Sequence, residues 1–143
     1  TSLPILQANL SLSNEVLMWR LFPGMPVHTY EKALHFPEVK ILVIETFGAG
    51  NAFSNPSFQS ALQRFIAAGG KVLNITQCQS GAVKQGAYQT STFFEKIGVI
   101  SGEDLTAEAA LTKCMYALAN VPATELASFL STPVVGELTR VNS

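Results

Sequence analysis

The clearest strand in the sequence is KILVIETF, residues 40–47, whose side chains are mostly β-branched, aliphatic or aromatic. Its apolar residues follow one another without alternation, as expected of a strand that helices cover on both faces. Residues 15–22 and 71–76 are predicted to be strands before and after it, and residues 99–100 a fourth, shorter piece. Such continuous apolar strands favour a parallel sheet.

Helical signals separate these strands. The best marked helix has Asn55 at its N-cap, Pro56 at its first position and Gly69-Gly70 at its end. Another begins after Thr106, which is expected to cap it. Weaker helices are expected at residues 26–36, 91–97 and 122–130, with Pro26 at the first position of the earliest. The inner face of the helix after Thr106 is predicted to consist of Leu111, Cys114, Met115 and Leu118.

The alternation of strand, loop and helix predicts an α/β fold. We expect a small three-layer α/β/α domain with a roughly four-stranded parallel sheet, flavodoxin-like in architecture. We assign this domain to residues 15–143 and residues 1–14 to the end of an interdomain linker. In such folds ligands meet the loops at the carboxyl ends of the strands, here residues 22–24, 46–51, 76–81 and 101–104.

The composition is poor in charge and rich in apolar residues. The 143 residues carry 9 Lys and Arg against 10 Asp and Glu, and only 13% are charged while 48% are hydrophobic. A disordered tail is therefore excluded, and neither a nucleic-acid partner nor a membrane-surface helix is expected, since both need clustered basic residues. The shortage of charge suggests that another chain or domain covers part of the surface.

Motifs for cofactors, metals and hydrolases are missing from the sequence. Phe53 stands where a dinucleotide fingerprint needs its third glycine, and there is no P-loop and no GxSxG. The two histidines, His28 and His35, fall on the first expected helix without a carboxylate partner, so we expect solvated side chains and no metal site. We predict no cofactor and no metal.

The two cysteines, Cys78 and Cys114, form no CxxC pair and no disulfide framework. We expect two reduced, mostly buried thiols in a cytosolic protein. The sequence opens at Thr1 without an initiator Met or a signal segment. We therefore expect a piece of a longer chain that lacks its N-terminal part.

Two loops at predicted strand ends carry polar groups. Gly48-Ala49-Gly50-Asn51 is either a tight strand-to-helix turn or a turn that presents the Asn51 amide to a ligand. Thr76-Gln77-Cys78 has the same placement one strand over, where a packed cysteine with satisfied amides competes with a ligand site. Glu103-Asp104 fits the N-terminal end of a helix, where acidic residues are favoured.

Taken together, the loops resemble the C-terminal domain of the type I (cytosolic) L-asparaginases, over about residues 16–139. Each motif is weak alone, but their order and spacing are specific. They are Leu21-Phe22-Pro23-Gly24, Glu45-Thr46-Phe47-Gly48-Ala49-Gly50-Asn51-Ala52, Asn74-Ile75-Thr76-Gln77-Cys78, Gly98-Val99-Ile100-Ser101-Gly102, Glu108-Ala109-Ala110-Leu111-Thr112-Lys113 and Gly136-Glu137-Leu138-Thr139.

The resemblance implies a cytoplasmic enzyme that hydrolyses L-asparagine to L-aspartate and ammonia. In that family the nucleophile lies in a larger N-terminal domain, so this chain should be catalytically inert alone and should need that domain as a partner. The active site forms at a contact within a homodimer or tetramer. The resemblance assigns substrate contact in the neighbouring subunit to Asn51, on the loop with Gly48 and Gly50.

Some bacterial members also bind asparagine at a regulatory site, which the resemblance places at Asn74, Thr76 and Cys78. Those members carry an arginine where this sequence has Glu45. A glutamate would repel the ligand carboxylate that an arginine would hold, which argues against this regulation.

Two alternative functions stay open. The same domain occurs in the asparaginase-like subunit of a tRNA-dependent amidotransferase, and a non-enzymatic amino-acid-binding or scaffolding domain is the other possibility.

Overall fold

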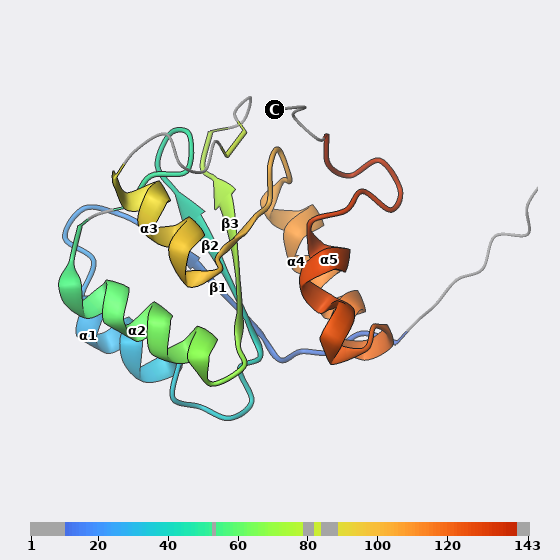
Figure 1. Ribbon diagram of the computed structural model, residues 1–143, viewed down its shortest axis with the longest axis horizontal. Helices are drawn as coiled ribbons and strands as arrows, with labels where there is room; N and C mark the ends of the chain where they lie inside the picture. Colours follow the sequence, from blue (N-terminus) through green and yellow to red (C-terminus); the bar gives the residue numbers. More distant parts are fainter. Residues whose placement is uncertain (1–10, 53, 79–81, 84–88, 140–143) are drawn as a thin grey trace, which may run out of the picture.

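Four parallel strands form the sheet, in the order β1-β2-β3-β4 along its width (Figure 1). A computed structural model gives the structure of residues 11–52, 54–78, 82–83 and 89–139. Each strand pairs in parallel with the next, which confirms the predicted four-stranded parallel sheet. The strands are β1 (Val16–Arg20), β2 (Ile41–Thr46), β3 (Lys71–Thr76) and β4 (Ile100–Ser101).

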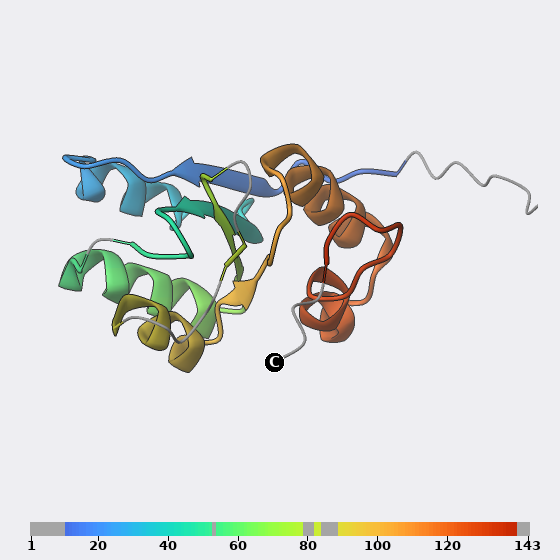
Figure 2. The same cartoon turned by 90° about the horizontal axis from the view of Figure 1, so that it is seen from above.

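The helices cover both faces of the sheet, which confirms the three-layer α/β/α architecture. Viewed from above, the first three helices lie on one side of the strands and the last two on the other (Figure 2). Right-handed crossovers between strands in sequential order place the first three on the same face. They are α1 (Val27–Ala33), α2 (Pro56–Ala67) and α3 (Gln89–Ile97), opposite α4 (Ala107–Asn120) and α5 (Leu126–Leu130), which the 3-10 turn η1 (Ala123–Glu125) precedes.

Strand β2 is buried along its whole length. Leu42 and Ile44 pack into the cluster under α1, α2 and α3, while Ile41 and Val43 pack into the cluster under α4 and α5. This two-sided burial explains why the strand has no polar alternation. Because side chains alternate between faces, Glu45 belongs to the α4 and α5 side of the sheet.

The helix signals of the sequence are confirmed where caps define them. The Asn55 side chain accepts a hydrogen bond of 3.0 Å from the Phe58 N–H, and Pro56 is the first residue of α2. Thr106 caps α4 in the same way, accepting from the Ala109 N–H at 3.2 Å. These caps satisfy N–H groups that the first turn of a helix leaves without partners.

The predicted inner face of α4 is confirmed for Cys114 and in part for Leu118, which packs half-buried against the core, and is wrong for Leu111 and Met115. The residues buried beneath the helix are Ala110, Lys113, Cys114 and Ala117. Leu111, Met115 and Leu118 are only half-buried. The small alanines let the helix approach the sheet closely, and Lys113 is buried because it finds an ion-pair partner, so the face turns away from the larger apolar residues.

Three smaller boundaries also differ from the sequence-based expectations. Pro26 is the N-cap of α1 and not its first residue, and α1 ends at Ala33, so His35 lies beyond the helix. Residues 122–130 form a 3-10 turn followed by α5 instead of one helix.

The residues before β1 are tied to α4. The Ser13 N–H donates to the Met115 carbonyl at 2.9 Å, and the Asn120 amide donates to the Ser11 carbonyl at 2.9 Å. Residues 1–10 of the expected linker lie outside the described part of the chain, so the boundary at residue 14 stays a prediction. Among the described residues, no helix has the length and apolar character that crossing a membrane requires.

Candidate functional site

The Gly48–Asn51 loop closes a tight turn at the carboxyl end of β2. Phe47 and Asn51 exchange backbone hydrogen bonds, with N···O distances of 2.7 and 2.8 Å, and the Gly50 N–H also donates to the Phe47 carbonyl at 3.0 Å. Gly48 and Gly50 have φ angles of +49° and +107°, which side-chain-bearing residues adopt only with strain. The glycines of the motif are therefore required by the turn itself.

Side chains of β2 and β3 support this loop from below. Asn74 Nδ2 donates to the Gly50 carbonyl at 3.3 Å, and the Thr76 hydroxyl donates to the Gly48 carbonyl. The Thr46 hydroxyl donates to Asn74 Oδ1 at 2.6 Å. All three supporting side chains are buried. The structure therefore brings Gly48, Gly50, Asn74 and Thr76 together as sequence-predicted site residues.

Glu45 does not join this cluster. Thr46, Asn74 and Thr76 alternate with Glu45, Leu73 and Ile75 along their strands, and the latter two pack beneath α4 and α5. The Glu45 side chain thus belongs to the face opposite Asn74 and Thr76. It is only 9% exposed.

Asn51 follows the glycine turn at the carboxyl end of β2. The residue is half-buried, and its Oδ1 is buried without a hydrogen-bond partner among the residues that the structure describes. A buried acceptor in that state costs about 1–3 kcal/mol, so native structures rarely leave one without a role.

The two cysteines differ in their surroundings. Cys114 is buried in α4 as predicted, and burial raises the pKa of its thiol to about 12 although the neighbouring Lys113 charge acts to lower it. Cys78 is exposed, so the expectation of a mostly buried thiol is wrong there. It follows the end of β3, where its N–H donates to the Thr76 hydroxyl at 3.0 Å and its side chain is left outside the core.

Gln77 belongs to the Thr76-Gln77-Cys78 loop, where the alternative to a ligand site was that the amides are satisfied within the protein, and its amide is satisfied in this way. Its Nε2 donates to the Leu21 carbonyl at 2.6 Å and to the Glu45 carbonyl at 2.8 Å. One side chain at the end of β3 thereby ties together the ends of β1 and β2. The position of Gln77 immediately after an apolar strand indicated a residue at the edge of the sheet. Its hydrogen-bond partners, the Leu21 and Glu45 carbonyls, could not be predicted because they are distant in the sequence.

A second polar cluster lies between α4 and the loop that follows α5. The Lys113 ammonium lies 2.5 Å from Glu137 Oε1 and 2.6 Å from the Thr132 carbonyl, while the N–H groups of Val134 and Val135 donate to the same carboxylate. Burial raises the pKa of Glu137, but the Lys113 ammonium and these N–H groups outweigh it and hold the pKa at about 2.

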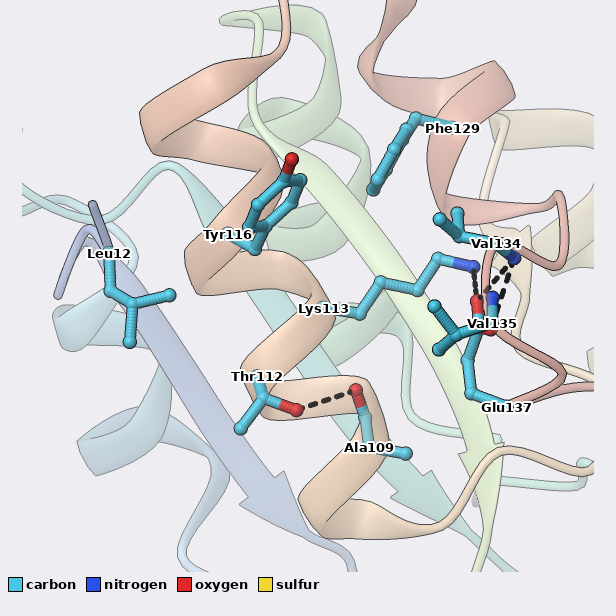
Figure 3. A pocket seen from close by; sticks show the side chains of 9 residues that line it. All are labelled: Leu12, Ala109, Thr112, Lys113, Tyr116, Phe129, Val134, Val135 and Glu137. Atoms are coloured by element: carbon cyan, nitrogen blue, oxygen red, sulfur yellow. Dashed lines mark hydrogen bonds and ion pairs between the residues drawn. The ribbon is translucent and has the colours of Figure 1, made fainter. Parts of the chain in front are cut away.

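This ion pair borders an apolar cleft of about 460 Å³ (Figure 3). Tyr116 and Phe129 stack across it with ring centroids 5.9 Å apart, and the Lys113 ammonium lies 5.7 Å from the Phe129 centroid. Val134 and Val135 are 54% and 86% exposed at its rim. These exposed apolar side chains thus belong to a loop that their own N–H groups and the ion pair hold in place.

His28 and Asp104 each contact another group of the protein. Both histidines are exposed, which confirms the expectation of solvated side chains. His28 Nδ1 lies 3.5 Å from Glu31 Oε2, so the expectation that neither histidine has a carboxylate partner is wrong for His28. Among the described residues no group of three His, Cys, Asp or Glu side chains could hold a metal ion. The Thr139 N–H donates to Asp104 Oδ1 at 2.6 Å and lowers the pKa of that carboxyl.

The fold and the loop define a parallel-sheet α/β domain that presents an amide at its carboxyl edge. Residues 15–126 match the model of the Glutaminase/Asparaginase C-terminal domain, and the chain belongs to that family. This confirms the resemblance seen in the loop motifs.

Relatives and solved structures agree with the family. L-asparaginase 1 of Escherichia coli K12 is 39% identical over 120 residues, which cover 83% of this chain and 35% of that protein. The human 60 kDa lysophospholipase is 38% identical over 108 residues, covering 76% of this chain and 18% of its own length. The crystal structure of L-asparaginase I from Vibrio cholerae matches with a TM-score of 0.80 and 35% identity, covering 88% of this chain and 38% of that one.

The amidotransferase alternative has weaker support. A glutamyl-tRNA(Gln) amidotransferase protein of Metallosphaera sedula is 29% identical over 132 residues, covering 92% of this chain and 29% of its own length. The chain therefore spans about a third or less of these relatives.

Proposed function

We propose that the chain is the C-terminal domain of an L-asparaginase, which hydrolyses L-asparagine to L-aspartate and ammonia. Its role is to complete the substrate site of a neighbouring subunit with Asn51 and to hold the oligomer together. Similarity to L-asparaginase 1 at 39% identity supports the enzyme class. The proposal extends to a cytoplasmic homodimer or tetramer and to an N-terminal asparaginase domain as partner.

The half-buried Asn51, whose Oδ1 has no hydrogen-bond partner among the described residues, is the observation that carries this role. Because that oxygen is buried in this chain, contact with a substrate requires the side chain to turn outward. An amide oxygen accepts hydrogen bonds, and the α-ammonium group of an amino-acid substrate is a strong donor. The loop that carries it is fixed by backbone bonds to Phe47 and by two side chains of β3. A rigid support of this kind suits a residue that must meet a ligand in one geometry.

The proposal keeps catalysis outside this chain. Residues 15–143 form the domain, residues 1–14 the end of a linker, and the nucleophile belongs to the N-terminal domain. A regulatory asparagine at Asn74, Thr76 and Cys78 is the weaker proposal, because the polar atoms of Asn74 and Thr76 already bind the Gly48–Asn51 loop. Such a ligand would first have to displace the loop.

The test compares the full-length protein with the 143-residue chain in an ammonia-release assay with asparagine and glutamine. We expect hydrolysis of asparagine by the full-length protein and none by the chain alone. Turnover by the pure chain would contradict the assignment of the nucleophile to another domain. A full-length protein that releases ammonia only with tRNA and a second protein would favour the amidotransferase instead.

Binding calorimetry distinguishes the non-enzymatic alternative from the enzyme. Saturable binding of asparagine, aspartate or glutamine to the 143-residue chain, with no hydrolysis by the full-length protein, would make the domain an amino-acid-binding module.

A further inference from the structure

We propose that Asn74 is a positioning residue, which sets the direction in which Asn51 presents its side chain. The proposal deepens the function proposed above and rests on it for its kinetic consequences. It also gives Asn74 and Thr76 a different role from ligand binding.

The central observation concerns the peptide unit between Gly50 and Asn51. Its carbonyl accepts from Asn74 Nδ2 at 3.3 Å, and its N–H donates to the Phe47 carbonyl at 2.8 Å. A peptide unit is planar, so bonds to both of its polar groups fix the orientation of the plane. The Asn51 Cα belongs to the same planar unit, so the orientation of the plane also fixes the position of this Cα, from which the Asn51 side chain extends.

The Asn74 amide has only one orientation that satisfies its neighbours. The Gly50 carbonyl can only accept, so the NH₂ group of Asn74 must face it. Asn74 Oδ1 then accepts from the Thr46 hydroxyl at 2.6 Å. The Asn74 side chain is fully buried, so water cannot replace either partner.

The backbone of Asn74 is anchored as well. Its carbonyl accepts from the Gly102 N–H at 2.8 Å, and a Cβ on Gly102 would lie 2.9 Å from that oxygen. Only glycine therefore permits this approach. The amide of Asn74 consequently reaches the loop from a fixed point on β3.

Val83 packs against Gly50 as well. A Cβ on Gly50 would lie 2.8 Å from Val83 Cγ1 and 3.4 Å from Asn74 Nδ2, and the Val83 N–H donates to the Glu103 carbonyl at 2.9 Å. The two side chains together leave no room for a larger residue at position 50.

The test uses two substitutions at Asn74 in the full-length protein. Asn74→Asp keeps an acceptor for Thr46 but sets a carboxylate oxygen against the Gly50 carbonyl, and Asn74→Leu removes both bonds at similar volume. Displacing a binding group by about 1 Å costs up to about 100-fold. We expect kcat/KM for asparagine to fall by about 10- to 100-fold, with most of the loss in KM, because Asn51 binds the ground state too.

Conservative and control variants separate positioning from general loss of stability. Thr76→Val removes the hydroxyl bond to Gly48 and should raise KM. Thr76→Ser keeps the hydroxyl, so KM should stay within about 3-fold of wild type, which corresponds to about 0.65 kcal/mol. Ile75→Val trims the neighbouring residue on the opposite face and should lower thermal stability without raising KM.

Hydrogen exchange of the Asn51 amide gives a readout that does not depend on activity. The N–H that bonds Phe47 should exchange faster in Asn74→Leu than in wild type and Ile75→Val. Unchanged exchange overturns the positioning role even if the protein proves not to be an asparaginase. Faster exchange with an unchanged KM, in a protein that does hydrolyse asparagine, overturns the link to substrate binding.

Discussion

The Lys113 ammonium and the Glu137 carboxylate lie 2.5 Å apart, although the two residues are 24 positions apart in the sequence. Lys113 is on α4, and Glu137 is on the loop that follows α5. Both side chains are nearly buried, at 5% and 12% exposed. The pair therefore fastens the residues after α5 to the helix that covers one face of the sheet.

Acid should weaken this attachment. The pKa of Glu137 is held at about 2 in the folded protein, against an ordinary value of 4.5 in the unfolded chain. A lowered folded pKa stabilises the protein above pH 4.5, and this contribution is lost as the pH falls towards 2. After allowance for partial exposure to water, we expect the loss to be about 2 kcal/mol.

Urea unfolding of wild type and Glu137→Gln between pH 5 and pH 2.5 measures this contribution. The free energies of unfolding should differ most at pH 5 and converge at the acid end, because glutamine does not titrate. If the difference in unfolding free energy between the two proteins did not change with pH over this range, Glu137 would have an ordinary pKa in the folded protein.

The thiols should react unequally with iodoacetamide. Cys114 is buried, and burial raises its pKa to about 12, so almost no thiolate is present at neutral pH. Cys78 is exposed. Mass spectrometry of the native protein should find modification at Cys78 and none at Cys114, and both should react in guanidinium chloride. Early native labelling of Cys114 would mean that α4 opens readily from the sheet.

Much of the fold follows from local sequence signals. The continuous apolar run of β2 predicted a sheet covered on both faces, and Asn55 and Thr106 marked two helix starts, because each signal acts within a few residues. The burial of Lys113 could not be predicted in this way. A lysine enters the core only when a partner compensates its charge, and that partner is Glu137, beyond two intervening helical segments.

The same limit applies at the site. The sequence placed Asn51 and Asn74 at the carboxyl edge, because both follow or end apolar strands. It left open whether the Asn74 amide binds a ligand or the protein itself. Asn74 binds the protein itself because its amide donates to the Gly50 carbonyl, and this carbonyl reaches Asn74 only in the folded chain.

Alanine substitutions at the two loop glycines should have different effects. Both have positive φ, so each alanine is strained, but a Cβ on Gly48 meets nothing within 4 Å. A Cβ on Gly50 would lie 2.8 Å from Val83 Cγ1. We expect Gly48→Ala to cost about 1 kcal/mol of unfolding free energy and Gly50→Ala about 2–3 kcal/mol. Equal losses in urea unfolding would show that Val83 moves aside freely.

Removal of the Asn51 amide should reduce activity without reducing stability. Its Oδ1 has no partner among the described residues, so Asn51→Ala leaves no donor behind and removes a buried acceptor that is not satisfied. The unfolding free energy should therefore stay within about 0.5 kcal/mol of wild type or increase. In the full-length protein, loss of a hydrogen bond to a charged substrate group costs about 1.5–3 kcal/mol, so kcat/KM for asparagine should fall about 10- to 100-fold.

Asn120→Ala is the control, because it removes an exposed amide at the end of α4. It should leave kcat and KM unchanged. A stable Asn51→Ala variant with wild-type kinetics would remove the substrate role from Asn51, whereas a strongly destabilised one would show that its amide serves the fold.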